Sequence, residues 1–139
     1  RIFAFVDATD EVTDYFEPHA DLTDALTRMM HDADLVRYDG HSDYGSAIST
    51  FAESWAHTVS ARTSLLILGD ARSNYRDPNL ETLKRLVDVA KHAYWLNPES
   101  RNQWGGGDSA ADDYEQVIEM FECRNARQLT SVVAGLLPI

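Results

Sequence analysis

The sequence predicts an α/β fold, a three-layer, doubly wound domain with a mostly parallel sheet, and three observations predict it. First, residues 64–68 contain four consecutive large apolar side chains between turn formers, which indicates a short strand buried on both faces. Second, such runs alternate with segments whose apolar residues recur every three or four positions, as in one-sided helices. Third, 139 residues suffice for one domain with its own core and are too few for two.

Four further segments complete the predicted strands. Residues 2–6 are rich in aromatic and β-branched side chains, and residues 8–11 contain turn formers. We expect residues 12–16 to return as a short antiparallel partner of residues 2–6. Residues 93–96 and 120–123 predict two more strands, the first ended by an Asn-Pro pair.

The predicted helices begin at Asp21, after a polar loop at 37–45, at Asp77-Pro78, at Ala110 and after Asn125. Asp77 is the expected N-cap of its helix, with Pro78 as the first helical residue. Asn125 and Gln128 have the spacing of a capping box, and Leu137 belongs to the apolar face of the helix that follows. Met29 and Met30 are expected to fill the core.

Charge and cysteine usage narrow the function classes. With 12 Lys+Arg and 23 Asp+Glu, the net charge is −11, which argues against binding to nucleic acid or to an anionic membrane surface. No apolar run approaches the roughly 20 residues that span a bilayer. The single Cys123 excludes an internal disulfide framework and indicates a reducing compartment, so we expect a cytoplasmic protein. Because the chain starts with Arg1 and enters a strand almost at once, we also expect a fragment of a longer chain.

Two carboxylates follow predicted strands without completing an enzyme motif. Asp70 follows Gly69 as in a Gly-Asp-Ser hydrolase motif, but Ala71 stands at the nucleophile position. Asp7 follows a strand as in phosphatases with an aspartyl nucleophile, but the expected second acid two residues on is Thr9. We therefore expect Asp7, with Asp10 near it, to be a solvent-facing turn residue.

The remaining pair is Ser42 and Asp70. Ser42 lies in a Gly-x-Ser loop that opens a helix, and Asp70 ends the next strand. A hydroxyl and a carboxylate from neighbouring loops are hard oxygen ligands suited to Mg²⁺, partly through water. His41 lies between Asp39 and Asp43, but the more economical interpretation is a solvated loop histidine.

The order of several motifs resembles the CoxE-like branch of von Willebrand factor A domains over nearly the whole chain. Those motifs are Phe3-Ala4-Phe5-Val6-Asp7, Glu11-Val12-Thr13-Asp14, Asp39-Gly40-His41-Ser42-Asp43-Tyr44-Gly45, Leu65-Leu66-Ile67-Leu68-Gly69-Asp70-Ala71-Arg72, Tyr94-Trp95-Leu96-Asn97-Pro98 and Asn125-Ala126-Arg127-Gln128-Leu129. The Trp-Leu-Asn-Pro ending is the most specific of them. The resemblance implies a metal-ion-dependent adhesion site built from three loops. Ser42 matches the Thr of the second loop and Asp70 the Asp of the third, whereas the Asp-x-Ser-x-Ser of the first loop is absent.

The absent first loop implies that the first central strand of the sheet is also missing. In this fold that strand lies between residues 2–6 and 64–68, so its loss leaves two strand edges unpaired in the middle of the sheet. We expect one of three remedies: direct pairing of those two strands, filling by a partner chain (for instance in a strand-exchanged dimer), or an upstream strand.

The function implied by the resemblance is a binding module and not an enzyme. CoxE-like proteins are thought to act with MoxR-type AAA+ ATPases in the maturation or assembly of metalloenzymes. A bound Mg²⁺ would keep an open position for an acidic residue of the partner, with weak or no Mg²⁺ affinity expected for residues 1–139 alone. Two alternatives remain open. One is a small metal-dependent α/β hydrolase or phosphoryl-transfer enzyme using Asp7 and Asp70, and the other is a metal-free protein-contact domain.

Overall fold

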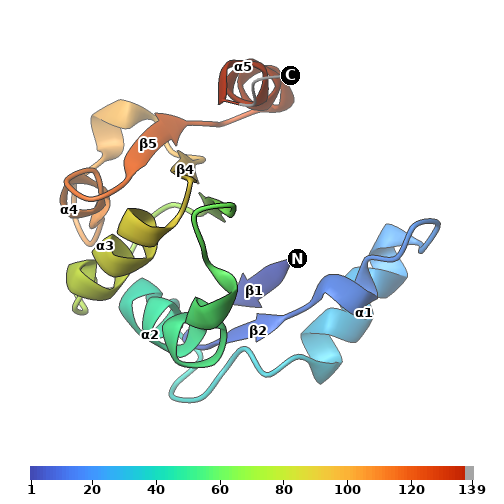
Figure 1. Ribbon diagram of the computed structural model, residues 1–139. Helices are drawn as coiled ribbons and strands as arrows, with labels where there is room; N and C mark the ends of the chain where they lie inside the picture. Colours follow the sequence, from blue (N-terminus) through green and yellow to red (C-terminus); the bar gives the residue numbers. More distant parts are fainter. Residues whose placement is uncertain (137–139) are drawn as a thin grey trace.

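The computed structural model describes residues 1–136, in which the strands form two separate sheets (Figure 1). β3 (Ser64–Leu68), β4 (His92–Asn97) and β5 (Glu119–Glu122) form a parallel sheet in the order β3-β4-β5. β1 (Phe3–Phe5) and β2 (Thr9–Glu11) form an antiparallel pair. The predicted α/β class with a mostly parallel sheet is confirmed.

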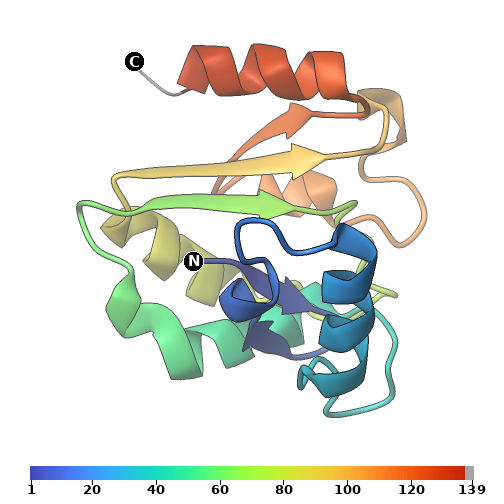
Figure 2. The same cartoon turned by 90° about the vertical axis from the view of Figure 1, so that its right-hand side faces the viewer.

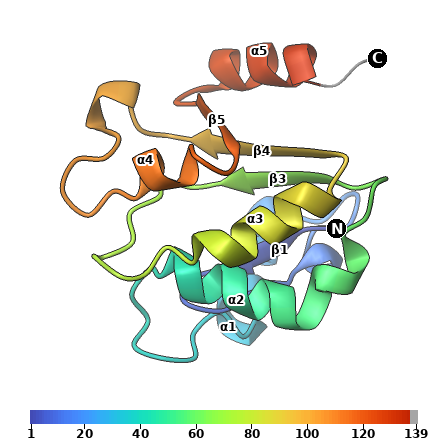
Figure 3. The ribbon, with the colours of Figure 1, turned by 60° about the vertical axis from the view of Figure 1, so that its left-hand side comes forward.

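Helices alternate with the strands of the parallel sheet. The helices are α1 (Leu22–Asp32), α2 (Tyr44–Trp55), α3 (Leu80–Val89), α4 (Ala111–Tyr114) and α5 (Ala126–Leu136), with short 3₁₀ turns at Thr13–Tyr15, Ala56–Thr58 and Arg101–Gln103. Figure 3 shows α2, α3 and α4 together on one side of the strands, with α5 beyond β5. α1 lies apart from the parallel sheet, next to the β1–β2 pair (Figure 1).

The core lies between the parallel sheet and the helices α2, α3 and α4. Its centre is aromatic: the ring of Trp95 stacks on that of Tyr114 at 4.6 Å between centroids and lies 5.4 Å from that of Tyr44. Trp95 is fully buried, as is Leu83 of α3. Large aromatic side chains of this kind contribute much of the apolar area that a core removes from water.

β3 is partly buried on one face and exposed on the other, so the prediction that it is buried on both was wrong. Its residues alternate in exposure along the strand, and the side chains of Leu66 and Leu68 are 47% and 59% exposed. Figure 2 looks onto this open face: β3 and β4 lie in front, and α3 and α4 lie behind them. Four consecutive apolar residues therefore do not settle whether one face of a strand or both are covered.

The two strands flanking the expected gap remain apart. β1 and β3 belong to different sheets in the described residues, so direct pairing is not the remedy that the chain adopts. A groove of about 610 Å³ runs between them. Filling by a partner chain and filling by an upstream strand both stay predictions.

The turn that joins the two antiparallel strands is shorter than expected. The partner of β1 is Thr9–Glu11, not residues 12–16, with Phe5 opposite Thr9. The chain reverses over a few residues, where the Val6 N–H donates to the Ala8 carbonyl at 3.2 Å. Residues 13–15 then form a 3₁₀ turn, and Val12 is buried.

Two helices differ from the prediction at their first turns. α3 begins at Leu80 because Asn79 has a left-handed backbone (φ 53°), which ends any helix started at Pro78. The Asp77 carboxylate still accepts the Asn79 N–H, at 2.8 Å. Before α5, Asn125 accepts the Gln128 N–H as predicted. The Gln128 side chain, however, accepts from the N–H of the preceding Arg124, at 2.7 Å. Leu137 lies outside the described residues.

The methionine pair of α1 does not fill a core. Met30 is 71% exposed, and Leu22 and Leu26 are exposed on the same helix. Only Ala25 of this helix is buried, since α1 lies away from the parallel sheet. The apolar periodicity correctly predicted the helix, but it did not predict which surface covers it.

Candidate functional site

Two polar loops meet at the carboxyl ends of the parallel strands. Residues 37–43 precede α2, and residues 70–79 follow β3. The side-chain amide of Asn74 donates to the Ser42 carbonyl at 2.8 Å, which ties the second loop to the first. Open α/β sheets bind ligands at this edge. The structure therefore places the segments that carry Ser42 and Asp70 side by side.

Asp70 is held by one oxygen of its carboxylate. The Oδ1 atom accepts a hydrogen bond from the Tyr44 hydroxyl at 3.0 Å and another from the Arg72 N–H at 2.9 Å. Among the described residues, the Oδ2 atom has no hydrogen-bond donor. The carboxylate is thus fixed in direction while its second oxygen stays available to a cation.

The Trp-Leu-Asn-Pro motif holds the backbone on which Asp70 sits. The Trp95 indole donates to the Gly69 carbonyl at 2.8 Å, and the buried Asn97 amide donates to the Asp70 carbonyl at 3.2 Å. These bonds link the end of β4 to the end of β3. The motif therefore positions the backbone of Asp70 and supplies no ligand itself. Its residue types alone do not indicate this role.

Gly69 makes room for the tyrosine that orients Asp70. A Cβ atom at position 69 would lie 2.2 Å from the Tyr44 hydroxyl, closer than any real contact. Burial, followed by the adjacent negative charge of Asp70, raises the pKa of Tyr44 above its ordinary range. The hydroxyl therefore remains a donor to Asp70 throughout the physiological pH range.

Asp7 is an internal anchor and not a solvent-facing turn residue, so that prediction was wrong. Its side chain is fully buried, and its two oxygens accept backbone N–H groups from residues 37–40 at 2.7–3.2 Å. Burial alone would raise the pKa of Asp7, but these four donors outweigh it and hold the pKa below its ordinary value. Asp7 thereby shapes the loop that carries Ser42. Asp10 is partly buried, and its oxygens accept the Glu11 and Asp34 N–H groups.

Arg72 joins the loops after β3 and β4. Its guanidinium contacts both oxygens of Glu99, at 2.7 and 3.1 Å, and the Asp108 carboxylate at 2.8 Å. The pKa of Arg72 is raised, mainly by its hydrogen bonds to Glu99 and secondly by the one to Asp108. The hydrogen bond from Arg72 in turn lowers the pKa of Asp108. The sequence did not predict these ion pairs, because Glu99 and Asp108 lie 27 and 36 positions from Arg72 along the chain.

A second arginine holds the loop around His41. Arg76 contacts the Asp39 carboxylate and donates to the Asp43 carboxylate at 3.2 Å. Asp43 also caps α2 by accepting the Ser46 N–H at 3.0 Å. His41 is exposed, as expected of a loop histidine, with its Nδ1 atom 3.4 Å from Asp39. The two acids beside His41 are engaged by Arg76, which leaves them poorly suited to a metal.

The Asp70 and Ser42 side chains have the chemistry of hard-cation ligands, but they do not by themselves make a cation site. No group of three or more His, Cys, Asp or Glu side chains that could hold a metal occurs in residues 1–136. Ser42 is exposed and uses its carbonyl in the bond from Asn74, so its hydroxyl and the free Asp70 oxygen are the donors available. Oxygen atoms of this kind are the ligands that Mg²⁺ prefers, and two of them would leave most of its coordination positions to other groups.

A mostly parallel α/β sheet with a loop-built site at the carboxyl ends of its strands defines the class of Rossmann-like binding domains. Within this class, the family described as VWA domain containing CoxE-like protein matches residues 1–132. The chain belongs to this family, as its motif order predicted. No curated protein and no solved structure matches the chain. In the described part of the chain, no helix has the length and apolarity needed to cross a membrane.

Proposed function

We propose that this protein-interaction domain binds its partner through the loop edge around Asp70. The observation that carries the proposal is the Asp70 carboxylate, which is fixed by Tyr44 and Arg72 and keeps one oxygen without a donor in the described residues. A fixed acid with a free oxygen suits a contact that is completed from outside. Membership of the VWA CoxE-like family supports the broader role in protein–protein interaction.

The proposed contact includes Mg²⁺. Asp70 and the Ser42 hydroxyl would hold the ion, which supplies an open coordination position for an acidic residue of the partner. Two protein donors make a weak site, so we expect little Mg²⁺ affinity before the partner adds its carboxylate. Such binding is lost when the ligating carboxylates are protonated.

The proposed partner is a MoxR-type AAA+ ATPase, and the proposed process is the maturation or assembly of a metalloenzyme in the cytoplasm. This part rests on the family resemblance. The net charge of −11 supports a basic protein surface or a divalent cation as the complement of the loop edge.

We further propose that the domain is not an enzyme. The alternative hydrolase or phosphoryl-transfer chemistry would need Asp7 as a nucleophile or base. Both oxygens of Asp7 already accept backbone N–H groups in a fully buried position, which argues against that role. Beside Asp70, Ala71 and Arg72 provide neither a nucleophile nor a base.

The experiment is a calorimetric titration of the protein with a MoxR-type AAA+ ATPase, in Mg²⁺ and in EDTA. We expect binding in Mg²⁺ that EDTA and Asp70→Asn each weaken at least about tenfold. Asp14→Asn is the matched control, because it removes the same charge from an exposed residue distant in sequence from the loop edge. Affinity that is the same in EDTA, or that falls equally in both variants, would overturn the metal-dependent contact.

A further inference from the structure

Tyr75 is an aromatic residue that the fold holds in solvent at the loop edge. It lies in the loop 70–79, which also carries Asp70, and the neighbouring Asn74 side chain donates to the Ser42 carbonyl at 2.8 Å. The residue is 84% exposed, so most of its ring touches no other part of the described chain. A ring held in water gives up the stabilisation that its burial would provide.

The backbone of Tyr75 is left-handed, which is unfavourable for a bulky side chain. Its φ is 60°, and that of the preceding Asn74 is 52°. Asparagine tolerates this conformation because its short polar side chain can form local hydrogen bonds, and glycine adopts it without a steric penalty. Tyrosine has neither advantage. Neither packing nor backbone preference therefore explains a tyrosine at this position.

Hydrogen bonds on both sides of Tyr75 fix the turn that presents it. The Arg76 N–H donates to the Ser73 carbonyl at 3.0 Å, which closes the turn around residues 74 and 75. The Asn74 N–H donates to the Asp108 carboxylate at 3.1 Å. The ring therefore projects from a backbone that is ordered before a partner binds, which lowers the entropic cost of a contact.

The segment that follows Tyr75 is attached to the covered side of the sheet. The Arg76 guanidinium donates to Asp43, the N-cap of α2, at 3.2 Å, and the Pro78 carbonyl accepts the Tyr114 hydroxyl of α4 at 2.8 Å. Figure 3 shows these two helices on one side of the strands. Tyr75 does not line the groove between β1 and β3. Its exposure is therefore separate from the question of what fills that groove.

The charges of this loop indicate what the ring contacts. Both of its arginines, Arg72 and Arg76, form ion pairs with carboxylates of neighbouring loops. In the part of the chain that the structure describes, Asp70 and Asp77 of the same loop form no ion pair. The charge left unmatched in the loop of Tyr75 is therefore negative. The face of an aromatic ring attracts cations as well.

We propose that Tyr75 is a contact residue for the protein partner and stacks on an arginine side chain of that partner. This inference rests on the proposed function, because it adds a second contact to the loop edge around Asp70. A guanidinium is planar and weakly hydrated, so it stacks on an aromatic face more readily than an ammonium group does. Tyrosine and arginine are also enriched among the residues that carry most of the binding energy of interfaces.

The first test is the titration with a MoxR-type AAA+ ATPase in Mg²⁺, with three variants of Tyr75. Tyr75→Phe keeps the ring and should bind within about twofold of the wild type. Tyr75→Leu keeps an apolar side chain without an aromatic face, and Tyr75→Gly removes the side chain. Both should weaken binding about fivefold or more. Equal affinities of the Phe and Leu variants would overturn the cation contact, and wild-type affinity of the Gly variant would overturn any contact.

Thermal unfolding separates loss of the contact from loss of the fold. Tyr75→Gly should raise the unfolding midpoint by about 1–4 °C, because glycine adopts the left-handed conformation without a penalty. Tyr38→Gly is the matched control, at a 67% exposed tyrosine in the loop before α2 whose φ is not positive, and should lower the midpoint. A midpoint that Tyr75→Gly leaves unchanged or lowers would overturn the argument from the backbone.

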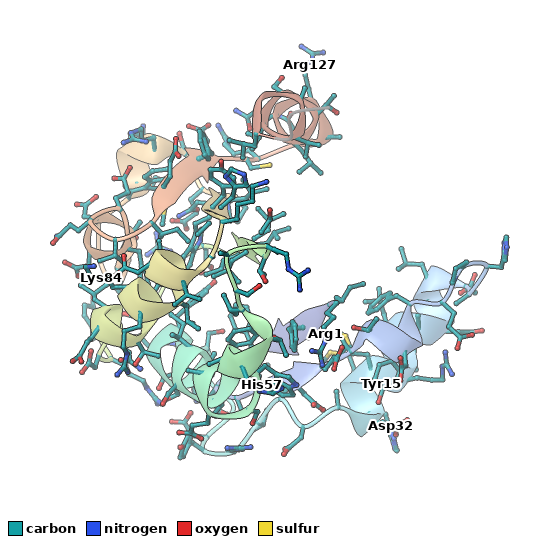
Figure 4. The ribbon with its side chains drawn as sticks, viewed as in Figure 1. Arg1, Tyr15, Asp32, His57, Lys84 and Arg127 are labelled. Atoms are coloured by element: carbon teal, nitrogen blue, oxygen red, sulfur yellow. The ribbon has the colours of Figure 1, made fainter. Side chains whose placement is uncertain are left out.

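A second probe tests Tyr75 without the ATPase. A synthetic peptide of alternating arginine and glycine is titrated in EDTA while NMR follows the tyrosine ring signals. Citrulline replaces arginine in the control peptide, because it has nearly the same shape without the charge. Only the arginine peptide should shift the Tyr75 signals. Those of Tyr15 (Figure 4), whose ring already has the Arg28 guanidinium at 6.0 Å, should stay in place.

The two probes distinguish failure of this proposal from failure of the proposed function. Equal shifts of the Tyr75 signals by both peptides, or no shift by either, would overturn the cation contact. A shift by the arginine peptide alone, without any binding of the ATPase, would reject the proposed partner and support the role of Tyr75. Binding of the ATPase that depends on Asp70 but not on Tyr75 would support the proposed function and overturn this inference.

Discussion

The two faces of the parallel sheet differ in what covers them. On one face, α2, α3 and α4 bury Trp95 completely, together with Leu83 and Tyr114. On the other face, Leu66 and Leu68 of β3 stay about half exposed, whereas Leu65 and Ile67 of the same strand are partly buried against the core. Figure 4 shows Arg127 on α5 and Asp32 on α1 at opposite sides of this open region. The packing that stabilises the fold is therefore concentrated on one face of the sheet.

The largest expected effect lies in the covered core. Trp95→Ala removes a fully buried indole and its bond to the Gly69 carbonyl, which should lower the free energy of unfolding by about 3–5 kcal/mol. Urea denaturation measures the loss. Tyr75→Ala, at an 84% exposed side chain, should change it by less than about 0.5 kcal/mol. Similar losses in the two variants would contradict the assignment of the core to this face.

The next effect concerns the internal anchor at the loop edge. Asp7→Asn weakens four hydrogen bonds to a buried carboxylate and should cost about 2–3 kcal/mol at pH 7. The pKa of Asp7 is lower in the folded than in the unfolded state, so its contribution is present above the unfolded value of about 4. It is lost as the pH falls through the folded value.

The difference in unfolding free energy between the wild type and Asp7→Asn should therefore shrink as the pH falls below the unfolded value of about 4, because the folded carboxylate, whose pKa is lowered, takes up its proton only below that value. Denaturation curves across this range measure it. A constant difference at all pH values would show that the charge of Asp7 contributes nothing to the fold.

A smaller effect tests how Asp70 is oriented. Gly69→Ala forces the new methyl group against the Tyr44 hydroxyl and should cost about 1–3 kcal/mol, while it releases the Asp70 carboxylate and weakens partner binding. Gly135→Ala is the matched control in α5, where nothing lies within 4 Å, and should be neutral or slightly stabilising. Thermal unfolding and the partner titration give the two readouts. Unchanged binding by Gly69→Ala would separate the tyrosine from the site.

Local sequence patterns predicted the elements better than their surroundings. Period and turn residues located β3, β4 and α2 because these signals depend on neighbouring residues. These local patterns did not predict that Leu66 and Leu68 are exposed. Exposure depends on whether a segment distant in sequence packs against that face of the strand. The same run of apolar residues is compatible with a strand covered on one face and with a strand covered on both.

The candidate site shows the same limit. The sequence predicts Ser42 and Asp70 from their places beside a helix and a strand, and the hydrogen bond from Asn74 to the Ser42 carbonyl brings their loops together. The roles of Asp7 and Arg72 could not be predicted, because their partners lie about 30 positions away and Asp7 binds backbone groups that any residue provides. Residue type and spacing indicate candidate ligands, whereas the anchoring roles of Asp7 and Arg72 depend on distant segments.

The smallest expected effect is on the open face of the sheet. Leu68→Ser removes an apolar side chain that is 59% exposed and should change the free energy of unfolding of residues 1–139 by about 0.5 kcal/mol or less. Urea denaturation of the monomer measures it, with Leu83→Ala as the fully buried leucine on the covered side, expected to cost about 2–5 kcal/mol. A cost for Leu68→Ser close to that of Leu83→Ala would mean that the open face is covered in solution.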